Sequence, residues 1–268
     1  MVTNGADNID WKGFLLPYEQ MVNELKVKFE NISKSFEYEG EPSPIEYVYG
    51  RVKTASSILE KAKRKNIPFE DLTTEMEDIG GIRLVCRFVE DIDRILYIIR
   101  SHADFEVIKE LDYVEGKKSS GYRSYHIKIK YKLYTMSGIK ELICEIQIRT
   151  LAMNFWATIE HSLRYKYKDN IPETIMERLR SSAEAAFNLD KEMSTIRDEI
   201  LQVQKERIAK NELAKQTMDK LNTLDIAMGK AKVDSLKHEL HELMAEGDLF
   251  KIQEFYRRLK ITIDIFTK

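Results

Sequence analysis

The sequence predicts an α+β protein, in which a β-sheet flanked by helices is followed by a helical C-terminal extension. Two observations predict this class. Between about residues 80 and 150, apolar and polar side chains alternate with the period of strands that bury one face. Before and after this region, apolar side chains recur at steps of three and four residues, as in amphipathic helices. With 268 residues, we expect one large domain over 1–204 and an extension over 205–268.

Three helices are expected before the sheet, over residues 10–38, about 45–65 and near 69–76. Asp10 is a candidate N-cap of the first helix. Residues 40–44 contain two prolines and one glycine and interrupt the chain, and Pro68 follows the second helix.

Four strands are expected over residues 82–88, 105–112, 123–133 and 140–149, with a helix over 90–102. In the last strand, Glu145 and Gln147 alternate with apolar neighbours and lie on the polar face. Ser137 and Gly138 between the last two strands predict an antiparallel hairpin. Helices are expected from residue 150 onward, over 150–168, 173–208 and, as two or three helices with a break at 244–248, over 211–268.

The composition excludes several classes of protein. Lysine and arginine number 43 against 45 acidic residues, a net charge of −2, which argues against a dedicated duplex-binding protein. No stretch approaches the roughly 20 apolar residues of a membrane span. Residues 1–8 lack the pattern of a signal peptide. Cys86 and Cys144 lie in apolar strands and are expected to be buried free thiols, as in a reducing compartment.

The expected second helix carries a polar stripe of Lys53, Ser57, Lys61 and Arg64 at steps of four, four and three residues. Such a column of cations with a hydroxyl suits a polyphosphate. Taken alone, the stripe favours an ordinary solvated helix face, because basic helix faces are common.

The segment 116–132 contains six lysines and arginines and no acidic residue. Its small residues predict a loop whose backbone N–H groups and lysines surround phosphate, and Tyr122 and Tyr125 offer rings for a base. A basic surface hairpin explains the segment equally well. A single-strand nucleic-acid surface uses the same residue types.

Two carboxylates are candidate ligands of magnesium. Asp78 precedes Gly80 at the entry to the first expected strand, and Glu145 lies within the last one. Carboxylate oxygens suit magnesium that carries phosphates, and a carboxylate near a sugar hydroxyl can act as a general base. An aspartate before a strand is usually a cap, whereas a glutamate within a strand is harder to explain structurally, because burying an unpaired charge is costly.

Other catalytic motifs find little support. His238 and His241 are three residues apart, not the four of the zinc-protease helix, and favour a solvated helix face. The chain contains no Walker pattern, no GxGxxG, no GxSxG and no histidine followed by aspartate.

Four ordered segments together resemble the synthetase domain of the RelA/SpoT family, in particular the small alarmone synthetases. The resemblance covers residues from about 10 to 200. The segments are Arg51-Val52-Lys53 with Ser57 and Lys61; Glu77-Asp78-Ile79-Gly80-Gly81-Ile82-Arg83; Ser120-Gly121-Tyr122-Arg123-Ser124-Tyr125-His126; and Glu145-Ile146-Gln147-Ile148-Arg149-Thr150, followed by Asn154-Phe155-Trp156-Ala157 and Glu160-His161.

The resemblance implies a nucleotidyltransferase-like mixed β-sheet flanked by helices. It implies magnesium-dependent transfer of the pyrophosphate of ATP to the 3′-hydroxyl of GDP or GTP, which yields ppGpp or pppGpp and AMP in stringent-response signalling. The implied site residues are Asp78 and Glu145 for Mg²⁺, with Glu145 also as base; Arg51 and Arg83 for adenine; Lys53, Ser57 and Lys61 for the ATP phosphates; and Lys118, Tyr122, His126 and Gln147 for the acceptor nucleotide.

The resemblance further implies a cytoplasmic homotetramer without a membrane or stable nucleic-acid partner. Product binding in a central cleft is implied for Lys26, Glu46, Tyr47 and Asn154. Leu111 stands where the family often has a basic residue, so the acceptor stays open among GDP, GTP and GMP.

Two other functions remain open from the residues. One is an RNA-binding module that uses the basic loop without catalysis, against which Asp78 and Glu145 argue, since carboxylates repel phosphate. The other is a nucleotidyltransferase that transfers AMP and releases pyrophosphate.

Overall fold

The computed structural model describes residues 10–116, 118–166, 171–223 and 229–266. Within α6, the described chain divides into two compact units between Ser194 and Thr195. The elements are α1 (Trp11–Tyr38), β1 (Tyr47–Val52), α2 (Ala55–Lys65), η2 (Phe69–Asp71), α3 (Leu72–Glu75), β2 (Gly80–Cys86), α4 (Glu90–Ser101), β3 (Glu106–Asp112), β4 (Tyr125–Thr135), β5 (Gly138–Thr150), α5 (Leu151–Lys166), α6 (Glu173–Thr223), α8 (Lys230–Glu246) and α9 (Leu249–Phe266).

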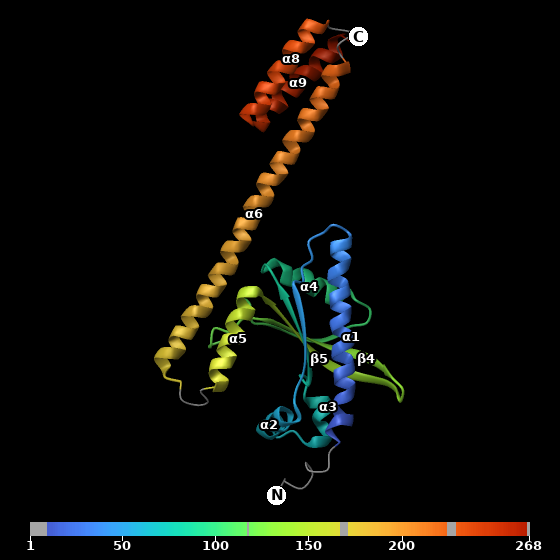
Figure 1. The fold of residues 1–268 in the computed structure, drawn as a ribbon, viewed down its shortest axis with the longest axis vertical. Coiled ribbons are helices and arrows are strands. Elements are labelled where there is room, and N and C mark those ends of the chain that lie inside the picture. The colour runs from blue at the N-terminus through green and yellow to red at the C-terminus, as the bar shows by residue number, and fades with distance from the viewer. Residues whose placement is uncertain (1–9, 117, 167–170, 224–228, 267–268) are drawn as a thin grey trace. The chain divides into compact units, whose positions relative to one another are not determined.

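The first unit is built on a five-stranded sheet with the order β1-β2-β5-β4-β3 (Figure 1). β2 pairs with β5 in parallel, and the other neighbouring strands are antiparallel. β4 and β5 form the expected hairpin, in which Thr135 pairs with Gly138. The predicted mixed sheet flanked by helices is confirmed.

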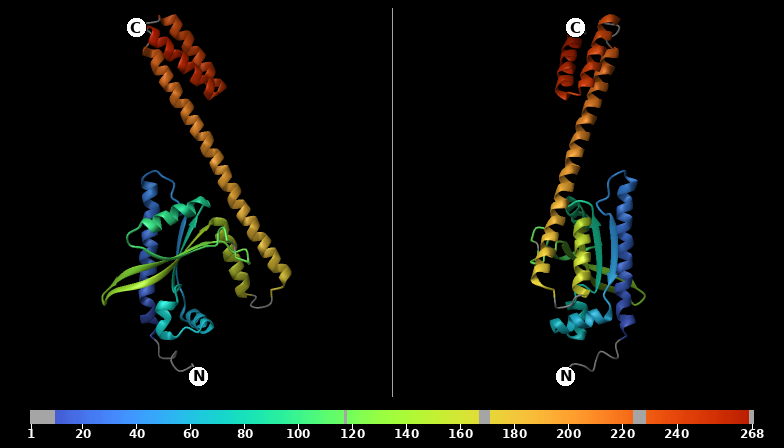
Figure 2. Two further views of the ribbon diagram at one scale, coloured as in Figure 1. Left: turned by 180° about the vertical axis from the view of Figure 1, so that it is seen from behind. Right: turned by 60° about the vertical axis from the view of Figure 1, so that its left-hand side comes forward.

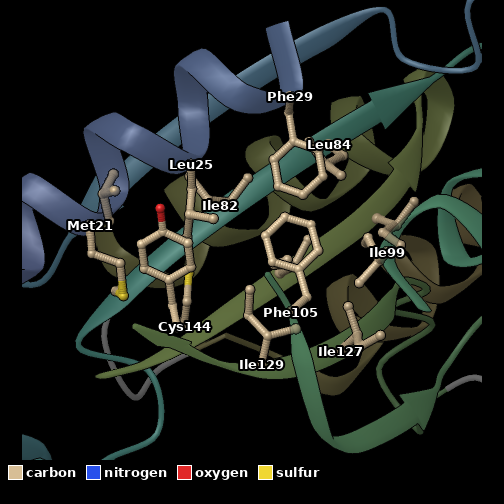
Figure 3. Close-up of a cluster of buried hydrophobic side chains, with 14 of the residues drawn as sticks. Met21, Leu25, Phe29, Ile82, Leu84, Ile99, Phe105, Ile127, Ile129 and Cys144 are labelled. Carbon is tan, nitrogen blue, oxygen red and sulfur yellow. The ribbon is translucent and has the colours of Figure 1, made fainter. Parts of the chain in front are cut away.

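One face of the sheet is apolar and is covered by α1 and α4 (Figure 3). Figure 3 shows Leu25 and Phe29 of α1 above Ile82 and Leu84 of β2, with Phe105 stacked beneath Phe29. These side chains belong to one buried cluster, which extends to Cys144. Cys86 and Cys144 are both free and buried, as expected.

Glycines allow α1 to lie close to the sheet. A Cβ atom on Gly50 would stand 2.6 Å from Val22 Cγ1, and one on Gly80 would stand 2.6 Å from Met21 Cε. Because Cβ atoms essentially never come this close to another atom, a larger residue at Gly50 would have to displace Val22, and one at Gly80 would have to move the flexible end of Met21.

The opposite face of the sheet is polar and carries the candidate site. In the right-hand view of Figure 2, α1 lies on one side of the strands and α5 on the other. α5 and the first part of α6 pack together through Trp156, Ala157 and Ala183. Trp156 donates from its indole nitrogen to the carbonyl of Leu179 at 3.1 Å. These helices border the polar face beyond the ends of β2 and β5.

The expected helix over 45–65 is wrong in its first half, because Tyr47–Val52 forms the edge strand β1. The helix itself begins at Ala55, where Thr54 is the N-cap. Two tyrosines and two valines within six residues give this segment the propensity of a strand, and antiparallel pairing with β2 secures it. Lys53 therefore lies before the helix, and only the other three residues of the predicted stripe lie on α2.

α6 is longer than the sequence analysis predicted. Its expected end near residue 208 is wrong, since the helix continues to Thr223. No glycine or proline occurs between Glu173 and Thr223, so no residue strongly favours an earlier end. The expected domain boundary at residue 204 thus falls within a continuous helix.

The second unit has a small core of its own, in which Leu221, Leu240 and Phe255 are buried. α8 ends at the expected break, where Gly247 adopts a left-handed conformation with φ of 74°. His238 is exposed and lies 3.5 Å from Glu242, in agreement with a solvated helix face. No helix in the described parts of the chain has the length and apolar character needed to cross a bilayer.

We expect Phe29→Ala to lower the free energy of unfolding by about 3–5 kcal/mol, because it opens a cavity between α1 and the sheet. Phe29 is completely buried, whereas Val27 on the same helix is 54% exposed. Urea unfolding of the two alanine variants measures the difference. A Phe29→Ala variant as stable as Val27→Ala would contradict this account of the core.

Candidate active site

The pairing of the strands arranges the polar face in two rows. In the first row, Arg51 pairs with Gly81, Gly81 with Glu145, and Glu145 with Lys128. In the second row, Tyr49 pairs with Arg83, Arg83 with Gln147, and Gln147 with His126. Because paired residues point to the same side of a sheet, residues from four strands share one surface. Gly81 contributes no side chain beside Glu145.

Asp78 stands at the entry to β2 and joins two of the predicted phosphate ligands. Its Oδ2 atom accepts a hydrogen bond from Lys61 and lies 3.4 Å from the Nζ atom of Lys53. Its Oδ1 atom is buried and has no hydrogen-bond partner in the described parts of the chain. Asp78 is therefore no simple cap: one of its oxygens neutralises cations, and the other is left to accept a further ligand.

Ser57 lies in the first turn of α2, close to the N-cap Thr54. The Oγ1 atom of Thr54 accepts from the backbone nitrogen of Ser57 at 3.3 Å and donates to its hydroxyl at 2.9 Å. Ser56 contributes a third hydroxyl, 3.0 Å from Thr54. The N-terminus of a helix favours anions, so these hydroxyls, Lys53 and Lys61 together suit phosphate oxygens.

Arg51 and Arg83 lie on adjacent strands on the same face, two residue pairs apart in the register. Arg51 is exposed, whereas Arg83 is half-buried and donates to Asn154 Oδ1 of α5 at 3.3 Å. Burial and the neighbouring charge of Arg149 lower the pKa of Arg83. Its Nε atom is buried without a hydrogen-bond partner in the described parts of the chain. Two guanidinium groups with planar faces thus border one end of the site.

Glu145 is held by donors on both oxygens. Oε1 lies 3.2 Å from Nδ1 of His126, and Oε2 accepts from Nε2 of Gln147 at 2.8 Å. Burial raises the pKa of Glu145, but these hydrogen bonds and the charges of His126 and Lys128 outweigh burial and lower it to about 2. Glu145 is therefore ionised at neutral pH, with its charge available to a cation.

Tyr122 and His126 form the other end of the site. The Tyr122 hydroxyl lies 2.8 Å from His126 Nε2 and accepts a 2.5 Å hydrogen bond from Arg149. The charged groups of Lys118 and Arg149 each lie 5.0 Å from the centre of the Tyr122 ring. Tyr113 packs edge-on against Tyr122 and His126. This end of the site thus combines aromatic rings, which can stack on a base, with cations, which can bind its phosphates.

Gly121 shapes the loop before Tyr122. Its φ of +88° lies in the left-handed region, and a Cβ atom there would stand 2.7 Å from the Cβ atom of Ala183 in α6. Both the backbone conformation and the space require glycine. Lys117, which the sequence analysis included in this loop, lies outside the described residues.

Lys128 links the loop that carries Asp78 to the strand that carries Glu145. Glu77, next to Asp78, accepts a hydrogen bond from Lys128 of β4. Lys128 is in turn the cross-strand partner of Glu145. The loop before β2 is thereby tied to β4, which pairs with the strand that carries Glu145.

The residues expected to bind product lie on α1, at the start of β1 and on α5. Lys26 lies on α1 and pairs with Glu30, and Glu46 pairs with Arg87. Tyr47 is exposed at the start of β1. Asn154 instead contacts Arg83, as described above, and so borders the candidate site.

Several residues that shape the site were not predicted from the sequence to have a role in it: Glu77, Tyr113, Lys128 and Arg149. Arg149 is the most connected, since it is buried and also donates to Gln147 Oε1 at 2.8 Å. A signal was present, because Arg149 follows Glu145 and Gln147 at steps of two and therefore shares their face.

The donor set fits a magnesium ion that carries phosphates. Such an ion needs only one or two protein carboxylates, and phosphates supply the remaining oxygens. Asp78 offers an unpartnered oxygen and Glu145 an ionised carboxylate. Within the described residues, no group of three or more histidine, cysteine, aspartate or glutamate side chains forms a cage that would hold a metal by itself.

Fold and site together define an enzyme that transfers a phosphate-containing group between nucleotides. The family model that describes a region found in RelA/SpoT proteins matches residues 50–170 of this chain. GTP pyrophosphokinase YjbM of Bacillus subtilis is 54% identical over 198 residues, which cover 74% of this chain and 93% of YjbM. The chain belongs to the RelA/SpoT family.

Solved structures agree with this assignment. The crystal structure of small alarmone synthetase 1 from Bacillus subtilis bound to its product pppGpp is 55% identical, with a TM-score of 0.69, and the match covers 71% of this chain and 97% of that one. The same synthetase bound to AMPCPP matches with a TM-score of 0.64 and 51% identity, over 72% of this chain and 98% of that one. The substrates of this family are nucleotides.

Proposed function

We propose that the chain transfers the β,γ-pyrophosphate of ATP to the 3′-hydroxyl of GDP or GTP, which yields ppGpp or pppGpp and AMP. The observation that carries this proposal is the polar face on which Glu145 lies with Arg83 and His126, next to the loop before β2 in which Asp78 contacts Lys53 and Lys61. The names of the relatives, a GTP pyrophosphokinase and a synthetase solved with pppGpp or AMPCPP, support it.

In this proposal, ATP binds at the cationic end of the site. Lys53, Ser57 and Lys61 receive the phosphates of ATP, and Arg51 and Arg83 hold adenine between guanidinium planes. Lys118, Tyr122, His126 and Gln147 receive the acceptor. Cations that offset the repulsion between two polyphosphates allow the acceptor hydroxyl to approach the β-phosphorus in line.

Magnesium, held by Asp78 and Glu145, would supply charge stabilisation of the transferring group. Glu145 accepts the proton of the 3′-hydroxyl. A pKa of about 2 makes it a weak base, so we assign its larger contribution to the negative charge that it places in the site.

The test is incubation of the full chain with ATP labelled in the γ-phosphate, GDP or GTP, and Mg²⁺. We expect the label on a guanosine nucleotide and AMP as the leaving product. Release of pyrophosphate instead of AMP would identify a different nucleotidyltransferase. Salt-dependent RNA binding without turnover would favour an RNA-binding module.

We expect Tyr122→Ala to weaken acceptor binding by about 1–3 kcal/mol, because a base loses its stacking partner. Tyr122→Phe is the matched control, since it keeps the ring and removes only the hydroxyl that contacts His126 and Arg149. Michaelis constants for GDP and for ATP, measured separately, distinguish the two substrates. An unchanged Michaelis constant for GDP in Tyr122→Ala would remove Tyr122 from acceptor binding.

We also propose that catalysis resides in residues 1–204 and that 205–268 form a packing or oligomerisation extension. The 198-residue match to YjbM and the separate core around Phe255 support this division. We further propose a cytoplasmic homotetramer that binds its product through Lys26, Glu46, Tyr47 and Asn154, on the strength of the resemblance. Turnover measured with and without added pppGpp tests the regulatory part of this proposal.

A further inference from the structure

Arg149, near the end of β5, contacts two residues of the proposed acceptor site through a single atom. Its Nη2 atom donates to the Tyr122 hydroxyl at 2.5 Å and to Oε1 of Gln147 at 2.8 Å. Its Nε atom donates to the hydroxyl of Ser124 at 3.3 Å, which orients the plane of the guanidinium group. Arg149 is only 4% exposed, so its side chain has little freedom to turn toward solvent.

The contacts of Arg149 complete a closed ring of hydrogen bonds. From Tyr122 the ring continues to Nε2 of His126 at 2.8 Å, and Nδ1 of His126 lies 3.2 Å from Oε1 of Glu145. Oε2 of Glu145 accepts from Nε2 of Gln147 at 2.8 Å, and Gln147 leads back to Arg149. Arg149 is thus two contacts away from Glu145 along one path and three along the other.

The chemistry of Arg149 and Glu145 sets the orientation of the amide between them. A guanidinium group can only donate hydrogen bonds, and an ionised carboxylate can only accept them. The oxygen of the Gln147 amide therefore faces Arg149, and its NH₂ group faces Glu145. Arg149 thus holds Gln147 in the orientation that supplies Glu145 with a donor.

The same guanidinium group holds the ring of Tyr122. Besides its hydrogen bond to the hydroxyl, the guanidinium carbon lies 5.0 Å from the centre of the ring. Tyr113 packs edge-on against this ring, with 6.4 Å between the two ring centres. A ring that is already fixed loses less freedom when a base stacks on it, and such preorganisation strengthens binding.

We propose that Arg149 is a positioning residue of the acceptor site, which acts through Tyr122 and Gln147. This inference rests on the proposed function in one respect, the binding of the acceptor by these two residues. The proposed ATP end should not depend on Arg149 in this way. The positive charge of Arg149 acts unfavourably on Arg83, so its removal would not weaken that end.

Calorimetric titration of the full-length chain tests the proposal. GDP is titrated into chain saturated with AMPCPP and Mg²⁺, and AMPCPP with Mg²⁺ is titrated separately. We expect Arg149→Met to weaken GDP binding by about 10-fold to 100-fold, the range for lost hydrogen bonds to a charged group, and to leave AMPCPP binding within about threefold of the parent. Arg149→Lys is expected to lie between Arg149→Met and the parent, because its ammonium group can donate to both oxygens but cannot also contact Ser124.

Arg94→Met is the matched control for the loss of an arginine. Arg94 on α4 also donates to two oxygens, Oδ1 of Asp91 and the carbonyl of Pro42, both at 2.9 Å. α4 covers the apolar face of the sheet, away from the candidate site. We expect this variant to bind GDP as the parent does.

A double-mutant cycle separates positioning from a merely structural role. Tyr122→Phe removes the hydroxyl that Arg149 contacts. If Arg149 acts through this hydroxyl, Tyr122→Phe should weaken GDP binding less in Arg149→Met than in the parent. In Arg94→Met, the effect of Tyr122→Phe should be the same as in the parent. Circular dichroism checks the fold of each variant, and the cycle is run with Arg149→Lys if Arg149→Met does not fold.

Three results would overturn the proposal: unchanged GDP binding in Arg149→Met, equal weakening of GDP and AMPCPP, or independent effects of the Arg149 and Tyr122 changes. Because the titrations need no turnover, they can be judged apart from the transfer reaction. A chain that transfers the label but shows no coupling would refute the role of Arg149 alone. A chain that shows the coupling but transfers no label would refute the proposed function and leave the role of Arg149 intact.

Discussion

Glu145→Gln is expected to lower turnover by about 10²–10⁴-fold, the range associated with loss of a positioned proton acceptor and its charge. The amide keeps the shape of the carboxylate, but the site loses a negative charge between the two ends of the polar face. Gln147 Nε2 and His126 Nδ1 both face the carboxylate, so the new NH₂ group also replaces an acceptor with a donor. Steady-state turnover with saturating substrates measures the loss.

Glu141→Gln is the matched control for this change. Glu141 lies on the same strand and the same face, but is exposed and lies 3.9 Å from Lys130. We expect it to retain parental turnover. A Glu145→Gln variant that works as fast as Glu141→Gln would remove Glu145 from the mechanism.

Asp78→Asn is expected to lower turnover by about 10²-fold or more and to weaken the dependence of the rate on Mg²⁺. The change removes the charge beside Lys53 and Lys61. Since both lysines then lose their neutralising partner, we expect metal-free binding of AMPCPP to be maintained or strengthened. Calorimetric titration with AMPCPP, with and without Mg²⁺, separates these two effects.

Asp93→Asn, an exposed position on α4, is the control for general effects of removing a carboxylate. It should show parental turnover and parental metal dependence. If Asp78→Asn weakened AMPCPP equally with and without Mg²⁺, Asp78 would act by organising the lysines and not as a metal ligand.

Alternation of side chains predicted the faces of the central strands correctly. Glu145, Gln147, His126 and Lys128 all lie on the polar face, and Cys144 lies on the apolar one. This succeeds because the two faces of a strand follow from residue parity alone. The same reasoning needs no knowledge of which strands are neighbours.

Edge strands and long helices were harder to predict. β1 has a weak burial pattern because an edge strand is covered on few sides, so Tyr47–Val52 shows no clear alternation. The length of α6 was underestimated because its sequence becomes polar after residue 203, although nothing there ends a helix. Its apolar contacts resume only in the second unit.

Contacts across strands depend on which residues of neighbouring strands pair. The alternation of apolar and polar residues does not specify this pairing. The pairing of Lys128 with Glu77 and Glu145, and that of Arg149 with Tyr122, became visible only in three dimensions. The resemblance to a known family added a hypothesis that the pattern did not contain, since it implied that Asp78 and Glu145 act together. It left Arg149 without a role, although Arg149 connects Tyr122 to Gln147.

The place of β5 in the sheet has a consequence for the motions of the site. β5 has a hydrogen-bonded neighbour on each side, whereas β1 is an edge strand. Amide hydrogens around Glu145 should therefore exchange with solvent only when the whole sheet unfolds, while those of residues 47–57 exchange through local opening. The segment that we propose binds ATP can thus open locally while the strand that carries Glu145 stays fixed.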